Sequence, residues 1–384
     1  MKILFLGNST SWHVAPWVNF FAKNHEVSLF SFIEPYAHSS SLKNVYLLHS
    51  YGFLGFFLKF FKVNTNFFYN FNKIISIPLA SIKLSIFIKK NNIQIVHAHS
   101  VYYGFLAYFI IPKVKIVFTP MGSDVLVHPV NSIFYKIMTR IAYIKPAMIT
   151  GDSYLIQKTG LKYGANMKKN FVIQNGVDQD IFYPSSKNPN LIDRYDISQE
   201  QFVLYSPRQV EELYNIDIIV ESLNLIKQQG HNFKCMFTYG PDSQYIKSLK
   251  EKVSEYKLDD NVIWLGLLTH KEMAEHYNLS DLVISIPSSD SSPRSVYEAA
   301  FCNKFIIVSD LDWSYEFFDN PKSLLKIPIR NINSLTKAIS DFMLDQSSFS
   351  KYVKNSNKIA QENFDFDKNM TQMEKLLYGL IDEH

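Results

Sequence analysis

Residues 282–310 read LVISIPSSDSSPRSVYEAAFCNKFIIVSD, and this stretch decides the fold. Its apolar start, LVISI, has the length and composition of a buried strand, and it ends in a loop rich in serine. A helix is predicted around Val296–Phe301, and KFIIVSD at 304–310 indicates a second buried strand. A strand, a loop, a helix and a strand in this order are typical of a parallel α/β sheet, in which ligands bind beside the loops that follow the strands.

The same order recurs along the chain before this stretch. A helix is also predicted from about His13 to Lys23, and Ser100 is a plausible helix N-cap. The segment KIVFTP is predicted to be a strand that ends in the loop MGSD (121–124). The further predicted strands are KILFLG (2–7), VSLFSF (27–32), IQIVHAH (93–99), KIVFTP (115–120), AMITGDS (147–153), FVIQNGV (171–177), FVLYSPR (202–208), FKCMFTYG (233–240) and NVIWLG (261–266).

The periodicity fails from residue 178 to about 189, where Pro184, Ser185, Ser186 and Pro189 indicate a linker. A chain of 384 residues suits two α/β domains of ordinary size. We therefore expect an α/β protein with two Rossmann-like domains that face one another across a cleft. The expected domains are residues 1–184, residues 185–365, and a last helix over 366–384 that crosses back to the first domain.

Composition narrows the class of protein. A formal net charge of +4, without a basic stripe or a nucleic-acid motif, argues against a nucleic-acid partner. Cys235 and Cys302 imply no disulfide framework and fit a reducing compartment. The N-terminus does not read as a signal peptide, and no apolar run reaches about 18 residues, so we expect a cytoplasmic protein without a transmembrane helix.

Aromatic residues make up 15% of the chain and concentrate early, for example in YGFLGFFLKFF at 51–61. Buried helices would explain them. The alternative is an interfacial surface at lipid headgroups, which would give the protein a peripheral place on the inner face of the cytoplasmic membrane.

Five segments of the chain carry recognisable motifs. They are His25-Glu26-Val27, TPMGSD (119–124), NGVD (175–178), SPRQVEELYNIDIIVESL (206–223) and the pair Asp290 and Glu298, which are eight residues apart. Taken in order, these motifs resemble the retaining GT-B glycosyltransferases of family 4, whose Glu-x7-Glu pair has the same spacing. The resemblance runs over nearly the whole chain, and one subgroup, with an SDGTPxSxxEA-like pattern, matches well.

The resemblance implies a site for a nucleotide-sugar donor. Arg208 would neutralise the departing diphosphate, Glu298 would bind the ribose hydroxyls, and Asp290 would contact the donor sugar. The loop and helix N-terminus near Asp290 would bind the diphosphate through backbone N–H groups. The further donor-binding candidates are Ser291, Ser292, Arg294, Ser295, Val296, Gly240, Gly266, and, from the opposite domain, Gly7 and Asn8.

The three principal donor-site residues also have purely structural explanations. Arg208 could be a surface residue at a strand end, Glu298 a capping or charge-pairing side chain, and Asp290 a turn residue.

On the acceptor side the candidates are His13, His99, Met121 and Gly122, and Asp124 is a candidate catalytic residue in a loop that opens toward the cleft. The histidines, with His97, could equally be structural.

The chain departs from the family pattern at two positions. Leu213 stands where the family has a phosphate-binding Lys, and Met121 replaces the His of TxHGxD. Arg294 could restore the missing positive charge. We expect neither a cofactor nor a metal, because the Asp-x-Asp pairs at 310–312 and 365–367 lie without other metal ligands.

The sequence thus predicts a retaining, metal-independent glycosyltransferase. The donor is expected to be a UDP-sugar, and the acceptor a glycan or lipid-linked molecule of bacterial cell-surface polysaccharide synthesis, such as capsule or lipopolysaccharide. A GT-B UDP-sugar epimerase and a non-catalytic nucleotide-sugar-binding partner are the alternatives. A dinucleotide oxidoreductase is disfavoured, because the first loop, GNSTSW at 7–12, lacks GxGxxG.

Overall fold

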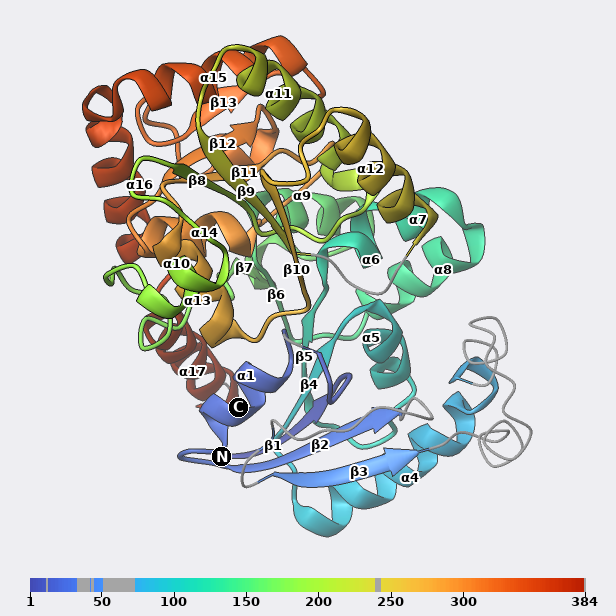
Figure 1. Ribbon diagram of the computed structural model, residues 1–384. Coiled ribbons are helices and arrows are strands. Elements are labelled where there is room, and N and C mark those ends of the chain that lie inside the picture. The colour runs from blue at the N-terminus through green and yellow to red at the C-terminus, as the bar shows by residue number, and fades with distance from the viewer. Residues whose placement is uncertain (12, 33–41, 43–44, 51–72, 239–242, 383–384) are drawn as a thin grey trace. The chain divides into compact units, whose positions relative to one another are not determined.

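The computed structural model describes all residues except 12, 33–41, 43–44, 51–72, 239–242 and 383–384 (Figure 1). It consists of two compact units. Unit 1 comprises Met1–Asn175 and Asp367–His384, and unit 2 comprises Gly176–Phe366. The division falls after Asn175, so the expected linker from residue 178 onward belongs to unit 2. The aromatic segment 51–61 lies outside the described residues.

Unit 1 is built on a parallel sheet of seven strands in the order β3-β2-β1-β4-β5-β6-β7. The order reverses between β1 and β4, which pair directly, with Ile3 opposite Ile95. The strands are β1 Lys2–Leu6, β2 Glu26–Phe32, β3 Tyr46–Ser50, β4 Ile95–His99, β5 Lys115–Thr119, β6 Met148–Gly151 and β7 Asn170–Val172.

Three helices of unit 1 bury their apolar sides in one core with this sheet. They are α4 (Ile77–Asn91), α5 (Val101–Tyr108) and α8 (Ile133–Ala142), whose residues Leu84, Leu106 and Met138 are buried in the cluster that contains Leu4 and Val96. The other helices of this unit are α1 Ala15–Phe21, α6 Gly122–Leu126, α7 His128–Asn131, α9 Tyr154–Lys162 and α17 Phe366–Asp382.

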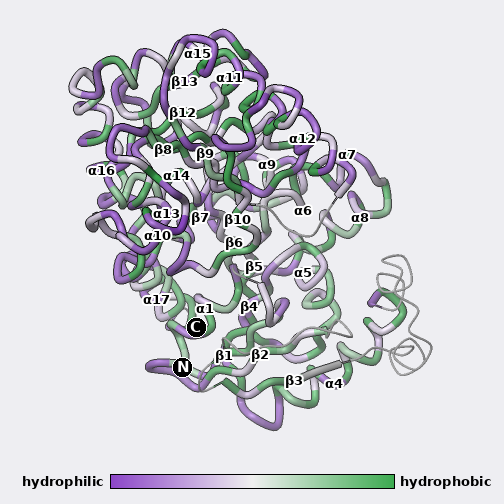
Figure 2. Tube along the Cα trace, in the orientation of Figure 1, coloured by the Kyte–Doolittle hydropathy of each residue, from purple (hydrophilic) through white to green (hydrophobic). Residues whose placement is uncertain are grey.

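Unit 2 has a parallel sheet of six strands in the order β10-β9-β8-β11-β12-β13, which reverses between β8 and β11. The strands are β8 Phe202–Ser206, β9 Phe233–Thr238, β10 Val262–Gly266, β11 Leu282–Ser285, β12 Phe305–Ser309 and β13 Leu325–Ile327. The helices are α10 Pro189–Arg194, α11 Ile216–Gln228, α12 Gln244–Glu255, α13 His270–Leu279, α14 Arg294–Phe301, α15 Ile332–Leu344 and α16 Ser350–Asn363. Figure 2 shows hydrophobic strands inside this unit and largely hydrophilic outer helices.

The structure confirms two parallel α/β domains, and each strand predicted from the sequence is present. The sequence missed β3 and β13, two edge strands of five and three residues. Ser100 does occupy the N-cap of α5, but its side chain forms no capping hydrogen bond. The predicted loop MGSD is also different, because α6 already begins at Gly122.

The family-like segment His25-Glu26-Val27 has a structural role in unit 1. The Nε2 atom of His25 lies 2.6 Å from Oε1 of Glu374, which belongs to α17. Its Nδ1 atom lies 3.2 Å from the N-terminal amine of Met1. His25 therefore ties the last helix to the start of the first strand.

Gly176 of the NGVD segment touches the chain that leads into α17. Its φ is +72°, and a Cβ atom there would lie 2.6 Å from Cα and 2.7 Å from N of Phe366. The next residue, Val177, donates its N–H to Phe364 O at 2.7 Å and accepts from Phe366 N at 3.2 Å. A side chain at residue 176 would therefore strain the backbone, and its Cβ atom would clash with backbone atoms of Phe366 that have little room to move.

We expect Gly176→Ala to destabilise unit 2 by more than the roughly 1–3 kcal/mol of a non-glycine residue at positive φ. Gly230→Ala is the matched control, because Gly230 has φ +83° but no atom within 4 Å of a built Cβ. Urea unfolding of both variants measures the difference. Equal losses of stability would show that the contact with Phe366 contributes nothing.

Candidate functional site

The candidate site of unit 2 lies where its strand order reverses. Arg208 follows β8 by two residues, and the serine-rich loop follows β11, which pairs directly with β8. In open parallel sheets the loops at such a reversal diverge and leave room for a ligand beyond the strand ends. The two segments that the sequence singled out are therefore neighbours in space.

Arg208 is held from three sides. Its Nη1 atom lies 2.9 Å from Oδ2 of Asp290, and the same atom donates to Ser295 Oγ at 3.4 Å. The guanidinium also lies 4.2 Å from the ring centroid of Tyr214, in the geometry of a cation–π contact. Burial disfavours the charge of Arg208, but Asp290 and Tyr214 outweigh it and raise the pKa of Arg208. The structure thus keeps a permanent cation at this position.

The Asp290 carboxylate joins this cation to the start of α14. Its Oδ1 atom accepts hydrogen bonds from the backbone N–H groups of Ser291 at 2.8 Å and Ser292 at 3.4 Å. These are two of the groups that the sequence predicted for the diphosphate. The Asp290 carboxylate is therefore bound by one cation and two backbone amides. Groups of this kind can bind other anions as well.

Glu298 lies one turn into α14 and is almost fully buried, with 4% of its side chain exposed. Arg294 Nε donates to Oε1 at 3.0 Å, and the Tyr277 hydroxyl lies 3.1 Å from Oε2 and from Ser295 O. Burial raises the pKa of Glu298, while Arg294 and Tyr277 act in the opposite direction. Glu298 therefore forms an ion pair with Arg294, and this pair is the structural explanation that the sequence had left open for Glu298.

The loop after β11 is fixed by a turn that no sequence motif indicated. Asn215, fully buried with φ +54°, donates from Nδ2 to Ile286 O at 2.8 Å and accepts from Ser288 Oγ at 3.1 Å. Ser288 N donates to Leu213 O at 2.8 Å. Leu213, the residue in place of the family's Lys, thus contributes its carbonyl to the loop while its side chain is 43% exposed.

The remaining donor-side candidates differ in their surroundings. Ser291 and Ser295 are buried beside Asp290 and Arg208, whereas Val296 is fully buried in the core of unit 2. Gly266 ends β10 with φ +76° and open space around a built Cβ, so its backbone conformation is what favours glycine. Gly240 lies outside the described residues.

Unit 1 has its own strand-order reversal between β1 and β4, and Gly7 and His99 meet there. A Cβ atom at Gly7 would lie 3.6 Å from Cβ of His99 and 2.9 Å from Cγ1 of Val14. His99 is 1% exposed, and its ring centroid lies 4.4 Å from that of His97. Trp17 contacts both imidazoles edge-on, with centroids 5.5 and 5.2 Å away.

These two histidines are held neutral. Burial, with the nearby His13, lowers the pKa of His99 to about 3, and burial with His99 lowers the pKa of His97. His97 Nε2 lies 2.7 Å from Thr119 Oγ1, which lies 2.6 Å from Thr150 Oγ1. This polar chain crosses three adjacent strands, and no single motif in the sequence revealed it.

Asp124 is not in an open loop, as the sequence suggested, but inside α6 and 6% exposed. Its Oδ2 accepts from Val101 N at 2.7 Å and its Oδ1 from Met121 N at 2.8 Å, so it caps both α5 and α6. Burial raises the pKa of Asp124 to about 8, although these two N–H groups favour the carboxylate. This position explains why Ser100 does not cap α5 itself.

The donor-side candidate Asn8 and the remaining acceptor-side candidates lie nearer the surface of unit 1. Asn8 Oδ1 accepts from Thr10 N at 3.0 Å and from Thr10 Oγ1 at 2.9 Å, which closes the turn after Gly7. His13 is exposed, and its backbone N–H donates to Ser11 Oγ. Met121 and Gly122 are half-buried at the start of α6.

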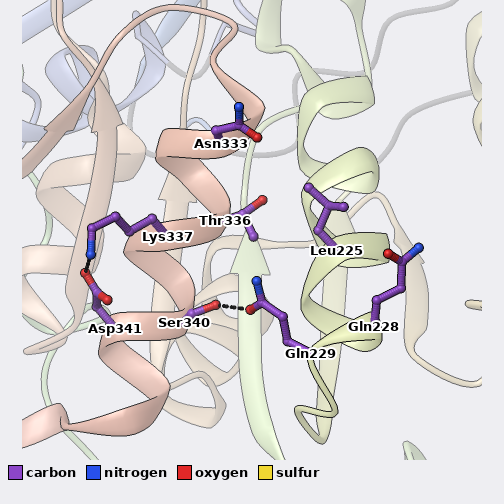
Figure 3. A pocket seen from close by; sticks show the side chains of 8 residues that line it. All are labelled: Leu225, Gln228, Gln229, Asn333, Thr336, Lys337, Ser340 and Asp341. Atoms are coloured by element: carbon purple, nitrogen blue, oxygen red, sulfur yellow. Dashed lines mark hydrogen bonds and ion pairs between the residues drawn. The ribbon is translucent and has the colours of Figure 1, made fainter.

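Two surface grooves contain none of these residues. One, of about 430 Å³, lies between α11 and α15, and its neighbouring polar side chains pair with each other, Ser340 with Gln229 and Lys337 with Asp341 (Figure 3). The other, of about 760 Å³, lies in unit 1 beside His25 and Tyr46.

Among the described residues, no group of three or more His, Cys, Asp or Glu is arranged to hold a metal ion. No helix in that part of the chain is long and apolar enough to span a bilayer.

Two parallel α/β units, each with its candidate residues at a strand-order reversal, define the GT-B type of protein. Residues 188–359 match the family described as "Glycosyl transferases group 1", and residues 2–153 match "Glycosyl transferase 4-like". With both halves matched in this way, the chain is a glycosyltransferase of the GT-B type.

Solved structures share the fold over the full chain. Anabaena HepE in complex with UDP and glucose has a TM-score of 0.77 at 15% identity and covers 99% of this chain and 100% of its own. A glycosyltransferase from Rickettsia africae has a TM-score of 0.79 at 18% identity and covers 100% and 99%. Sucrose-phosphate synthase from Thermosynechococcus elongatus has a TM-score of 0.78 at 14% identity and covers 100% and 99%.

A more limited similarity links the chain to alpha-galactosylglucosyldiacylglycerol synthase of Streptococcus pneumoniae. The two are 24% identical over 184 residues, which are 47% of this chain and 46% of that protein. The match therefore spans about half the length of either protein.

Proposed function

We propose that this chain transfers a sugar from a UDP-sugar, with retention of anomeric configuration and without a catalytic metal. The acceptor would be a glycan or a lipid-linked molecule of bacterial cell-surface polysaccharide synthesis, such as capsule or lipopolysaccharide. The observation that carries the proposal is the anion site formed by Arg208 and the N–H groups of Ser291 and Ser292 at the strand-order reversal of unit 2.

Asp290 occupies this site in the structure, and its carboxylate resembles a phosphate in charge and in hydrogen-bond acceptors. A diphosphate would replace it on Arg208 and on the amides, which releases Asp290 to contact the donor sugar. Arg208 then stabilises the charge that grows on the leaving diphosphate. In this scheme the departing phosphate oxygen takes the proton of the acceptor hydroxyl, so no protein nucleophile takes part.

The choice of a UDP-sugar rests on relatives. HepE has been solved with UDP, with UDP-glucose, and with UDP and glucose. The Streptococcus pneumoniae relative is named as a synthase of a glycosylated diacylglycerol, which supports a lipid-linked acceptor.

Thermal unfolding with a panel of nucleoside diphosphates tests the donor site. We expect UDP to raise the melting temperature without added metal, because binding to the folded state adds about 2.7 kcal/mol of stability at 100 times Kd. ADP and GDP are the matched ligands. The absence of any shift, with each of the three, would contradict a donor site.

Slow hydrolysis of the UDP-sugar then separates an enzyme from a protein that only binds it. A glycosyltransferase releases UDP and free sugar in water, and a non-catalytic partner releases neither. An epimerase converts the UDP-sugar into its epimer, which chromatography of the nucleotide-sugar detects.

A further inference from the structure

Exposed hydrophobic side chains gather on the outer side of α4, α5, α7 and α8 in unit 1. Of the 24 large hydrophobic side chains that are exposed in the described part of the chain, 13 lie between residues 75 and 144. Scattered exposed apolar residues are ordinary, but a concentration on one part of a surface indicates an interaction. We call this set the aliphatic face: Ile75, Leu79, Ile82, Ile86, Tyr108, Phe109, Ile111, Val127, Val130, Ile133, Phe134, Ile137 and Ile144.

Both long helices of this face are apolar on two sides. In α8, Met138 and Ala142 pack into the core, while Ile133 and Ile137, at 73% and 50% exposure, point outward. In α4, Leu84 and Ile88 are buried, while Leu79, Ile82 and Ile86 are exposed at helical spacing. An ordinary surface helix is polar on its outer side. Figure 2 shows hydrophobic stretches along α4, α5 and α8.

The end of α5 connects these helices. Ile111 N donates to Ser85 Oγ of α4 at 3.1 Å, and Lys145 Nζ, just after α8, donates to Tyr108 O at 3.2 Å and to Ile110 O. The exposed side chains of α4, of the end of α5 and of α8 are therefore parts of one surface.

The charge of this region has one sign. Between residues 73 and 151, all of them described, the sequence contains nine Lys or Arg and a single acidic residue, the buried Asp124. The small net charge of the whole chain hides this, because the rest of the chain has more acidic than basic residues. The cations exposed around the aliphatic face are Lys83, Lys89, Lys90, Lys113, Arg140 and Lys145.

This combination restricts the partner. A second copy of the chain, docked symmetrically, would place these cations against one another, which is unfavourable. A nucleic acid offers phosphates but gives Ile133, Ile137 and Ile82 no apolar environment. Bare aliphatic side chains surrounded by Lys and Arg suit the interface of a bilayer that contains anionic lipids.

We propose that the aliphatic face docks on the surface of an anionic lipid bilayer. The exposed isoleucines enter the boundary between headgroups and acyl chains, and the surrounding cations remain at the headgroups. No covalent step is involved, and the inference does not depend on the donor or the reaction proposed for unit 2.

Co-sedimentation of the full-length protein with vesicles tests this surface. We expect binding to vesicles of phosphatidylcholine with phosphatidylglycerol, much weaker binding to phosphatidylcholine alone, and release by added salt. Ile133→Ser with Ile137→Ser should weaken binding by about a hundredfold, since each of the two lost aliphatic contacts costs about a factor of ten or more. Lys89→Gln with Arg140→Gln should weaken it roughly 25-fold.

The matched control is Leu344→Ser with Lys354→Gln in unit 2, where Leu344 is 76% exposed and Lys354 is exposed as well. It should bind vesicles as the unaltered protein does, and all variants should keep their melting temperatures. Absence of vesicle binding, or binding that the face variants do not reduce, overturns the proposal. A dimer in light scattering that Ile133→Ser with Ile137→Ser dissociates would instead make the face an interface between copies and overturn it as well.

Discussion

Arg208→Ala is expected to lower the turnover number of sugar transfer by about 10²–10³-fold, the usual loss when one charge-stabilising donor is removed from an active site. The Arg208 side chain pairs with the Asp290 carboxylate in the structure, and it would pair with the diphosphate of a bound donor. Its contact with Tyr214 and Ser295 fixes its direction, so the charge is in place before the reaction begins. KM for the donor should rise less than turnover falls, because the charge on the leaving group grows in the transition state.

Arg208→Ala also leaves the Asp290 carboxylate without its ion pair, and part of any loss could come from a disturbed loop. Arg208→Lys separates the effects, because it keeps a charge but not the planar guanidinium of the Tyr214 contact. It should restore part of the turnover. Arg194→Ala, which removes an exposed arginine of unit 2, is the control for the loss of one positive charge. Turnover of Arg208→Ala within a few-fold of the control would exclude Arg208 from the reaction.

The sequence predicted the sheets because each buried strand carries its own signal, a short apolar run followed by small or polar residues. It missed β13, which has only three residues, and β3, which is as long as β1 but lies at the edge of the sheet, where a strand pairs on one side only. It brought Arg208, Asp290 and Glu298 together through a family motif, and the structure places these three around one helix, α14. Their chemical roles stay predictions.

The residues that hold this cluster could not be read from the pattern. Asn215 and Tyr277 reach the site through contacts with Ile286, Ser288 and Glu298, which lie far away in the sequence. Asp124 illustrates the opposite case. Its position after a strand suggested an open catalytic loop, but both of its carboxylate oxygens bind backbone N–H groups, one of them from the neighbouring helix. Only the packing of α5 beside α6 reveals that.

Glu298→Ala is expected to weaken UDP binding by about 10–100-fold, because hydrogen bonds to a charged group contribute about 1.5–3 kcal/mol. The side chain is nearly closed off by Arg294 and Tyr277, which hold one oxygen each. A carboxylate oxygen has two acceptor sites, so each can keep its present donor and still accept a ribose hydroxyl. This arrangement orients Glu298 before the nucleotide arrives, which favours binding.

Arg294→Ala tests the Arg294–Glu298 pair by removing the partner of Glu298. It removes the partner that orients Glu298 and the charge that could replace the Lys absent at Leu213, so UDP affinity and turnover should both fall. Titration calorimetry with UDP and with UMP separates the two contributions. Loss of orientation weakens both ligands equally, whereas loss of a phosphate contact weakens UDP more.

Glu298→Gln supplies the decisive comparison. It keeps the shape and one carbonyl acceptor but breaks the ion pair with Arg294, so its UDP affinity should lie between those of the unaltered protein and Glu298→Ala. If all three bind UDP equally, Glu298 is only a buried partner of Arg294. The ribose contact would then have to come from another residue of unit 2, while the anion site at Arg208 would be unaffected, because no hydrogen bond of Asp290, Ser291 or Ser292 described above depends on Glu298.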